Sequence, residues 1–433
     1  MTAEDKTPIP QDLERVAGGG LLHRRELLVG GAFAAGAFSL RPGLAEAGSV
    51  GAAQPPSMRK PGAPFRGYGQ PSRFEKSVKR GIIKIYGDLA PGAGVSTTPL
   101  QSLNGTITPN GLHFNRSHNG VPDIDPKSHY LLIHGLVKRP LKFDMNALLR
   151  YATTSRICFL ECSGNSFFNS NLFPEPKQLP VGMLHGLVSA AEWIGIPLAT
   201  LLDEAGVKPE ARWVLAEGAD AAAMSRSVPI EKCLDDAMIA LHQNGERIRP
   251  EQGYPMRLLV PGFEGNLSVK WLRRIKLTTE PTQTKDETSK YTELMPGGKA
   301  RQFTYPMGVK SVITRPATGL AMQGPGFYEV SGLAWTGHGR VARVEVSADG
   351  GASWADAALS EPNLPLALVR FRLPWQWDGS PVVLMSRATD EKGNVQPLRA
   401  AWSAQYAAGQ LYHCNAIQSW NIAANGEIKN VYV

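Results

Sequence analysis

The sequence predicts an α+β protein in which a mixed domain is followed by a β-sandwich. Between residues 97 and 305, short β-rich runs and short helical patterns follow one another irregularly, which argues against a doubly wound parallel sheet. After residue 306 the runs become short and alternating, which is typical of a β-sandwich. The turns between these runs are Asp349-Gly350-Gly351, Asp378-Gly379 and Lys392-Gly393-Asn394.

The first 47 residues are predicted to be an export signal. Arg24 and Arg25 precede a Gly/Ala-rich apolar stretch, and Ala45-Glu46-Ala47 is a small-x-small cleavage pattern. The apolar stretch is shorter than the ~20 residues of a membrane span. The paired arginines favour the twin-arginine route over a Sec signal that happens to hold two arginines. We therefore expect a mature chain without a membrane span, exported folded to the periplasm.

Residues 48–96 form a predicted irregular arm, because prolines interrupt any long helix there. Eight lysines and arginines gather between residues 58 and 84. A solvated arm lying on the surface is the favoured interpretation, and a docking strip for a partner is the alternative. The whole chain carries a net charge of +8, which suits an anionic substrate or an acidic partner. No basic run is interleaved with aromatic residues, so nucleic acid is not expected as a partner.

Within the mixed domain, 97–305, the residue patterns predict individual elements. Helices are expected from Asp144, as N-cap, to Tyr151 and from Glu192 to Ala205, where Gly206 ends the second. Strands are expected at 130–135, 155–162, 211–217 and 254–261. In the β-sandwich, 306–433, strands are expected at 327–332, 343–347, 367–373 and 382–388.

The chain has four cysteines at irregular spacing, which predicts no disulfide framework. No Cys-x-x-Cys or Cys-x-x-Cys-His sequence occurs, so zinc, iron–sulfur and covalent c-type haem sites are not expected in this chain. Cys162, in Phe159-Leu160-Glu161-Cys162-Ser163-Gly164-Asn165, stands out. Its thiolate could bind a soft or high-valent metal, although most free cysteines are simply buried in a core.

Three segments favour the interpretation of Cys162 as a metal ligand over its interpretation as a buried core residue. Phe114-Asn115-Arg116-Ser117-His118, the Cys162 segment and Val269-Lys270-Trp271-Leu272 resemble, in this order, the molybdenum domain of the sulfite oxidase family. Ala334-Trp335-Thr336-Gly337 and the run from Val346 to Trp354 resemble its immunoglobulin-like dimerisation domain. The resemblance implies a molybdopterin-binding domain at 97–305, a dimerisation domain at 306–433, and one Mo-molybdopterin per chain with Cys162 as metal ligand.

The same resemblance implies roles for further residues. Arg257 would hold the pterin phosphate, Asp220 the pterin amino groups, and Arg116 and Tyr291 would act with Cys162 in catalysis. Gln252 stands where the family commonly has a histidine. The implied cofactor-binding residues are Phe114, Asn115, Arg116, Ser117, His118, Cys162, Asp220, Gln252, Arg257, Ser268, Val269 and Lys270.

The implied substrate pocket departs from the sulfite-oxidising pattern. Phe167 and Ile422 align with positions where the family has arginines, and Met183 with a family tryptophan. Each lost guanidinium removes a charge-assisted contact of ~1.5–3 kcal/mol, which favours a less anionic or bulkier substrate than free sulfite.

This pattern resembles the sulfane dehydrogenase branch of the family, which oxidises sulfane sulfur on a carrier protein during thiosulfate oxidation. That branch implies a dihaem c-type cytochrome subunit as electron acceptor and a homodimer of this chain within a heterotetramer. Two alternatives remain open at this point. One is a periplasmic sulfite dehydrogenase, and the other is a non-catalytic β-sandwich binding protein with a degenerate molybdenum domain.

Overall fold

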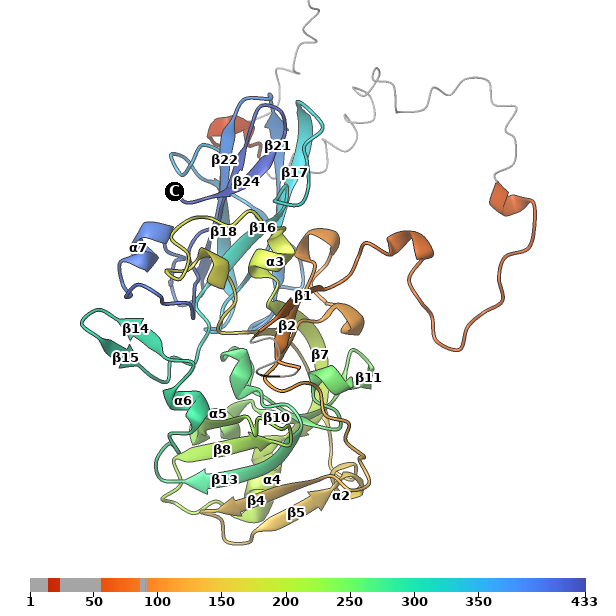
Figure 1. The fold of residues 1–433 in the computed structure, drawn as a ribbon, viewed down its shortest axis with the longest axis vertical. Coiled ribbons are helices and arrows are strands. Elements are labelled where there is room, and N and C mark those ends of the chain that lie inside the picture. Colours follow the sequence, from red (N-terminus) through yellow and green to blue (C-terminus); the bar gives the residue numbers. More distant parts are fainter. Residues whose placement is uncertain (1–14, 24–55, 86–89, 91) are drawn as a thin grey trace, which may run out of the picture.

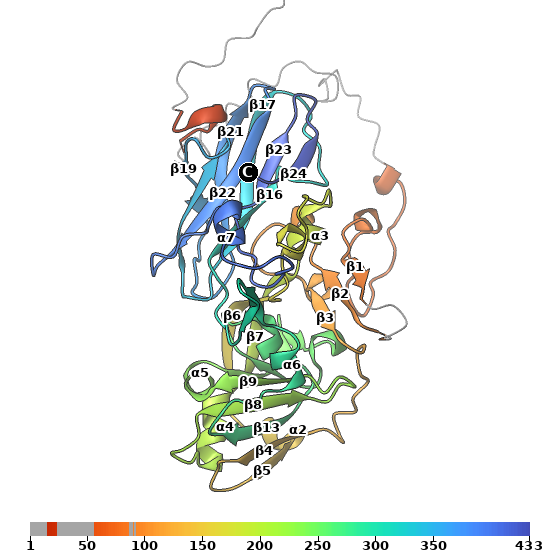
Figure 2. The same ribbon diagram turned by 60° about the vertical axis from the view of Figure 1, so that its left-hand side comes forward.

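The computed structural model describes residues 15–23, 56–85, 90 and 92–433. Arg24 and Arg25, the apolar stretch after them and the predicted cleavage pattern lie outside the described residues. The described chain forms two bodies stacked end to end, with the β-sandwich at the top and the mixed domain at the bottom (Figures 1 and 2).

Two five-stranded sheets build the mixed domain and enclose much of its apolar core. The first has the order β5 (Leu141–Asp144), β4 (Tyr130–Gly135), β13 (Leu272–Thr278), β8 (Trp213–Gly218) and β9 (Ser225–Pro229). The second has the order β11 (Glu246–Arg247), β10 (Met238–Gln243), β7 (Val188–Pro197) and β6 (Thr154–Glu161), with β12 (Arg257–Leu259) paired to β10. The pairs are antiparallel except β13 with β4, so the α+β prediction is confirmed.

The helices are short. They are α2 (Met145–Leu148), α3 (Val181–His185), α4 (Leu198–Ala205), α5 (Ile230–Asp235), α6 (Lys285–Thr288) and α7 (Arg399–Ser403). Turns of 3-10 helix are η1 (Gly18–Gly20), η2 (Pro56–Met58), η3 (Arg73–Glu75), η5 (Leu100–Ser102), η6 (Asn110–Leu112), η7 (Phe167–Asn169), η8 (Pro250–Gln252) and η9 (Gly265–Leu267). As predicted, the Asp144 side chain accepts the Ala147 N–H at the start of α2, and Gly206 ends α4 in the left-handed region.

The helix predicted from Glu192 to Ala205 is wrong in its first half. Residues up to Pro197 belong to β7, and only Leu198–Ala205 is helical. β7 pairs with β6 on one side and β10 on the other, so its backbone groups are satisfied by sheet bonds. Tertiary pairing therefore overrides the apolar periodicity of this segment.

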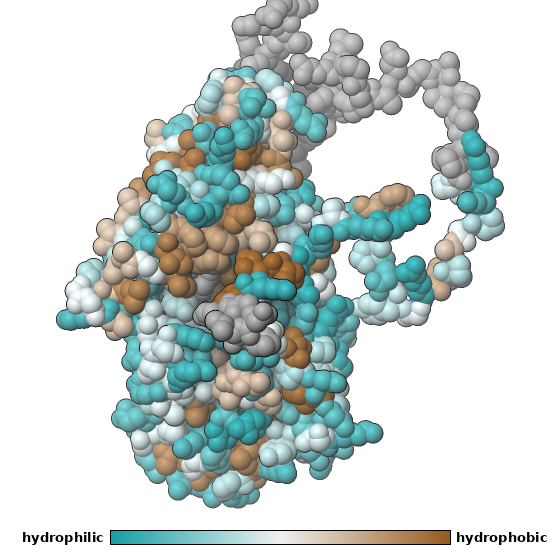
Figure 3. Space-filling view, in the orientation of Figure 1, coloured by the Kyte–Doolittle hydropathy of each residue, from teal (hydrophilic) through white to brown (hydrophobic). Residues whose placement is uncertain are grey.

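Among its described residues, the predicted irregular arm (48–96) contains one complete strand and most of a second. β1 (Gly81–Lys84) pairs with β2 (Gly94–Thr97), and β2 pairs with β3 (Asn115–Ser117). Before β1 nearly every residue from 57 to 79 is exposed, and the arm loops away from the body (Figure 1). Figure 3 shows it as a mainly hydrophilic strip. Its exposed apolar side chains include Phe65 and Phe74. The Tyr68 hydroxyl donates to Glu246 at 2.9 Å, which ties the arm to the mixed domain.

The C-terminal body is a β-sandwich, as predicted. One sheet has the order β16 (Lys310–Arg315), β17 (Gly326–Trp335), β21 (Val369–Trp377) and β20 (Ala358–Leu359). The other has the order β19 (Ala355–Asp356), β18 (Val341–Ser347), β22 (Val382–Asp390), β23 (Ser419–Ile422) and β24 (Ile428–Val431). Four buried tryptophans fill the space between them: Trp335, Trp375, Trp377 and Trp420. A separate hairpin, β14 (Glu293–Met295) with β15 (Lys299–Arg301), leads into the sandwich.

No helix in the described part of the chain is long and apolar enough to cross a membrane.

Candidate active site

One cavity in the mixed domain brings together every residue predicted to act in catalysis or to bind the cofactor. It lies where the end of β6, strand β3 and the segment from η8 to Trp271 meet, with Tyr291 at one side. The predicted residues that line it are Phe114, Asn115, Arg116, Ser117, His118, Cys162, Asp220, Gln252, Arg257, Ser268, Val269, Lys270 and Tyr291. Lining residues that the sequence did not single out for the site are Leu160, Met224, Gly265, Asn266 and Trp271.

Cys162 lies at the end of β6, where the cysteine loop (Cys162–Asn165) begins. Its N–H donates to Leu187 O at 2.9 Å, and its carbonyl accepts the Asn165 N–H at 2.8 Å. Cys162 is half-buried in the cavity wall, whereas Cys158, Cys233 and Cys414 are buried. Burial raises the pKa of the Cys162 thiol, so metal binding would have to displace its proton.

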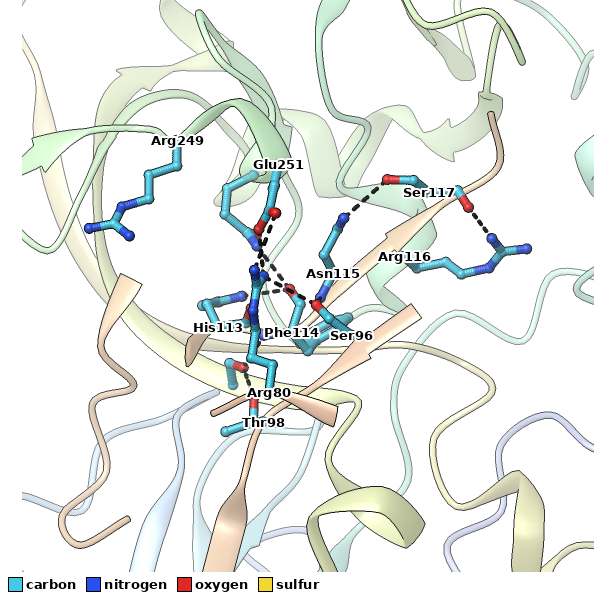
Figure 4. Close-up of polar contacts among 12 residues, drawn as sticks. Arg80, Ser96, Thr98, His113, Phe114, Asn115, Arg116, Ser117, Arg249 and Glu251 are labelled. Carbon is cyan, nitrogen blue, oxygen red and sulfur yellow. Dashed lines mark hydrogen bonds and ion pairs between the residues drawn. The ribbon is translucent and has the colours of Figure 1, made fainter. Parts of the chain in front are cut away.

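Strand β3 carries three residues of the cavity lining, Asn115, Arg116 and Ser117. Figure 4 shows their side chains. Arg80, directly before β1, binds Glu251 through Nη1 and Nη2, at 2.5 and 3.2 Å, and donates to His113 O at 3.3 Å. Figure 4 shows Arg116 on the other side of this cluster, beside Ser117. Its guanidinium contacts the carbonyl oxygens of Ser117 and Gly94 and no carboxylate of the described residues, so its charge can bind an anion.

Two cations, the buried Arg257 and the partly buried Lys270, face the same cavity. Arg257 donates to Gln252 O at 3.1 Å and to Ser268 O at 2.6 Å, and its Nε has no partner among the described residues. Lys270 Nζ contacts Asn115 Oδ1 at 2.5 Å and two backbone carbonyls at 3.0 Å. Burial lowers the pKa of Arg257 to about 9 and that of Lys270 well below its usual value.

These two cations indicate which kind of ligand the cavity binds. Within the described chain neither cation has a carboxylate at ion-pair distance, and a buried charge without a counter-charge is costly. An anionic group bound in the cavity would remove that cost. A phosphate-bearing pterin therefore fits the donor set, with Arg257 and Lys270 on its anionic tail and Cys162 as the soft ligand for its metal.

His118 and Tyr291 form a hydrogen-bonded pair beside Cys162. The His118 Nε2 and Tyr291 Oη atoms are 2.9 Å apart. Burial first, and then the nearby Arg116 charge, lower the pKa of His118 to about 3, so the ring is neutral at physiological pH. Burial also raises the pKa of Tyr291 well above its usual value, so its phenol stays protonated. Tyr291 has a φ of 55°, a strained conformation that aims its ring into the cavity.

Glu161, the residue before Cys162, is held by the β-sandwich. Glu161 is 1% exposed and accepts hydrogen bonds from Trp335 Nε1 at 2.6 Å, Asn165 Nδ2 at 2.9 Å and Lys310 Nζ at 3.2 Å. Lys310 begins β16 and Trp335 ends β17. The sandwich thus fixes the end of β6 from behind the cavity, a role that the sequence analysis missed.

His413 supports the cysteine loop from a second direction. Its backbone N–H donates to Ser163 O at 2.7 Å. Its ring lies between two buried carboxylates, with Nδ1 2.9 Å from Glu293 Oε1 and Nε2 3.3 Å from Glu264 Oε2. Burial alone would lower the pKa of His413, but the two carboxylates outweigh it and raise the pKa to about 9. Arg226, 2.8 Å from Glu264, completes the cluster.

The residues aligned with the substrate pocket do not line this cavity. Ile422 is fully buried in the core of the sandwich, on β23, so aligning it with a substrate-binding arginine is wrong. Met183 packs against Gly81 and Thr97, with its sulfur 3.4 Å from Thr97 Oγ1. The Phe167 ring packs against the ring of Phe168, with 4.0 Å between ring centroids and an angle of 32° between the ring planes. Arg116, by contrast, does line the cavity.

Comparison with known proteins agrees with this geometry. Residues 118–285 match the oxidoreductase molybdopterin binding domain, and residues 301–420 match the Mo-co oxidoreductase dimerisation domain. The chain is 31% identical to the sulfite oxidase of Gallus gallus over 334 residues, which cover 71% of this chain and 72% of that protein. The chain belongs to the sulfite oxidase family. Its lower body is a molybdopterin-binding domain, and its β-sandwich is the dimerisation domain.

Two further relatives show the breadth of the family. The chain is 31% identical over 365 residues to an NADH nitrate reductase of Solanum lycopersicum, covering 74% of this chain and 39% of that protein. It therefore spans about two fifths of the length of the plant nitrate reductases that it matches. It is also similar to the crystal structure of the sulfane dehydrogenase SoxCD from Paracoccus pantotrophus, with 43% identity and a TM-score of 0.85. That match covers 88% of this chain and 97% of the other.

Proposed function

We propose that this sulfite oxidase family chain is the molybdenum subunit of a sulfane dehydrogenase. It would oxidise sulfane sulfur, held as a persulfide on a carrier protein, to a sulfonate during thiosulfate oxidation. The observation that carries the proposal is the 43% identity to a sulfane dehydrogenase over 97% of that chain. The sulfite oxidase of Gallus gallus and the nitrate reductase of Solanum lycopersicum are each 31% identical to this chain.

The charges of the cavity support this substrate. Its two arginines are Arg116 and Arg257, and the latter is held by Gln252 O and Ser268 O beside the predicted pterin tail. Arg116 is then the guanidinium left for the substrate. A single guanidinium suits a singly charged persulfide better than the compact, doubly charged sulfite, for which several would be expected.

When bound, the molybdenum cofactor would supply two-electron oxidation and oxygen-atom transfer to sulfur. Each oxygen taken from water leaves two protons and two electrons. Arg116 would bind the anionic sulfur, and Cys162 would hold the metal. The protonated Tyr291 Oη, fixed by neutral His118 Nε2 at 2.9 Å, would donate a hydrogen bond to the oxygen being transferred.

The electrons would pass to a separate dihaem c-type cytochrome subunit, and two copies of this chain would pair in a heterotetramer. The match to a dimerisation domain supports the pairing. The periplasm is the proposed compartment, reached by the twin-arginine route. Replacing Arg24 and Arg25 by lysine should leave the full-length chain in the cytoplasm, and normal export of that variant would refute the route.

The experiment that tests the proposal compares two substrates on the cofactor-loaded chain with its cytochrome acceptor. We expect kcat/KM for the persulfidated carrier to exceed that for free sulfite by at least tenfold. A preference for free sulfite would instead identify a periplasmic sulfite dehydrogenase. If the loaded chain turns over neither compound, the enzymatic proposal fails and the non-catalytic alternative is favoured.

A further inference from the structure

A segment near the N-terminus occupies a groove on the β-sandwich. Residues Arg15–His23 lie beside β21, at the end of the sandwich remote from the cavity (Figures 1 and 2). Leu21 and Leu22 are 0% and 1% exposed. Leu21 is bridged to Trp375, and the Leu22 N–H donates to Pro374 O at 3.1 Å. Two neighbouring leucines that are almost completely buried indicate a specific packing contact between this segment and the sandwich.

The glycines before these leucines restrict which sequences can occupy the groove. Gly18 N–H donates to Ser353 Oγ at 2.7 Å, and Gly19 O accepts from Trp375 Nε1 at 2.6 Å. A Cβ on Gly19 would lie 2.4 Å from Ala348 O, and one on Gly20 would lie 2.0 Å from Gln376 O. Gly19 and Gly20 also have φ of 68° and 88°, which other residues rarely adopt. The groove therefore requires glycine at both positions.

This segment lies inside the predicted signal and directly precedes Arg24 and Arg25. We propose that the β-sandwich carries a docking groove for the chain's own residues Arg15–His23, which ties the start of the export signal to the folded sandwich until the chain is cut. The groove is formed by the turn between β18 and β19, which holds Asp349 and Ser353, and by residues 374–376 of β21. Because both walls belong to the sandwich, the segment docks only when that domain has folded. The inference does not rest on the proposed substrate.

Hydrogen exchange on the uncut, full-length chain tests the docking. The Leu22 amide should exchange at least 100-fold more slowly in the wild-type chain than in Gly20→Val, where a side chain would collide with Gln376 O. Val16→Thr is the matched control, because Val16 is 37% exposed, and it should behave as the wild type. Ser353→Leu leaves the sequence of the docked segment unchanged but removes the hydroxyl that accepts the Gly18 N–H. It should release the segment as Gly20→Val does.

The amides of β21 that pair with β17 report in the same experiment that the sandwich is folded. Slow exchange at Leu22 that both Gly20→Val and Ser353→Leu abolish, with β21 still protected, would support the groove. If Leu22 in the wild-type chain exchanges as fast as in Gly20→Val, or if neither variant speeds its exchange, the docking proposal is overturned.

Discussion

The wall of the cavity that faces the cofactor and the support behind Cys162 differ in whether their charged side chains have partners of opposite charge. The cofactor wall (Phe114–His118, Gln252, Arg257 and Ser268–Lys270) holds the cations Arg257 and Lys270, which donate to amide, carbonyl and hydroxyl oxygens and to no carboxylate of the described residues. In the rear support (Glu161, Glu264, Glu293, Lys310 and His413) each buried charge has a partner of opposite sign. The wall is electrostatically incomplete without an anion, and the support is complete without one.

This contrast distinguishes the residues that bind the cofactor from the residues that stabilise the fold. A charge that lacks a partner inside a folded chain is retained for a ligand, whereas a paired one stabilises the architecture that positions the ligand. Changes in the cofactor wall should therefore remove the cofactor and leave the chain folded. Changes in the rear support should lower the stability of the chain, with or without cofactor.

The largest effect is expected from Cys162→Ser. An alcohol oxygen is a poor substitute for a soft thiolate, so turnover should fall to background and molybdenum should be lost or weakly held. Cys158→Ser, four residues earlier and fully buried, is the control and should change stability at most. Activity and metal content of both purified variants would be compared, and a Cys162→Ser chain with full metal and full turnover would refute the ligand assignment.

Two buried arginines provide a matched pair for the comparison. Arg257→Met should reduce pterin content at least tenfold, since charge-assisted contacts contribute ~1.5–3 kcal/mol, while the cofactor-free chain should be as stable as wild type or more so. Arg226→Met removes the partner of Glu264 and should destabilise the cofactor-free chain instead, by ~3–5 kcal/mol. Denaturant unfolding and pterin analysis of both variants measure this, and identical behaviour of the two would contradict the distinction.

Lys310→Met tests the support that reaches Glu161 from the sandwich. The variant leaves a buried carboxylate without its cation, which should cost ~3–5 kcal/mol of unfolding free energy. The double variant Lys310→Met, Glu161→Gln removes both charges and should recover a large part of that loss. Urea unfolding of the cofactor-free chains gives the comparison. If the double variant is as unstable as the single one, the two charges do not act as a pair.

A smaller, pH-dependent effect is expected from His413. Because its pKa is raised to about 9, its contribution to stability is fully present below about pH 6.5 and is lost as the pH rises through 9. A wild-type chain should therefore lose ~1–3 kcal/mol across this window relative to His413→Gln, which has no such titration. Unfolding free energies of both chains at pH 6 and pH 9.5 measure the difference, and parallel curves would show that His413 is not charged in the fold.

The sequence predicted the cofactor wall because its residues lie in short contiguous motifs, such as Phe114–His118, whose members stay together in the fold. It missed the rear support because those contacts join distant parts of the chain, as Glu161 and Lys310 do. Ile422 was misplaced for a related reason: no local pattern near the C-terminus distinguishes a core residue from a pocket residue. The helix predicted from Glu192 failed where sheet pairing overrode the apolar spacing.

The central claim is that the unpaired cations of the cofactor wall and the thiolate of Cys162 together hold a molybdenum pterin. Its most direct test is metal and pterin analysis, with molybdenum X-ray absorption, of the chain purified from a host that makes the cofactor. The account predicts one molybdenum and one pterin per chain, and a protein thiolate contribution to the absorption spectrum that Cys162→Ser lacks. A folded chain that contains neither molybdenum nor pterin, or a spectrum that is unchanged in Cys162→Ser, would contradict it.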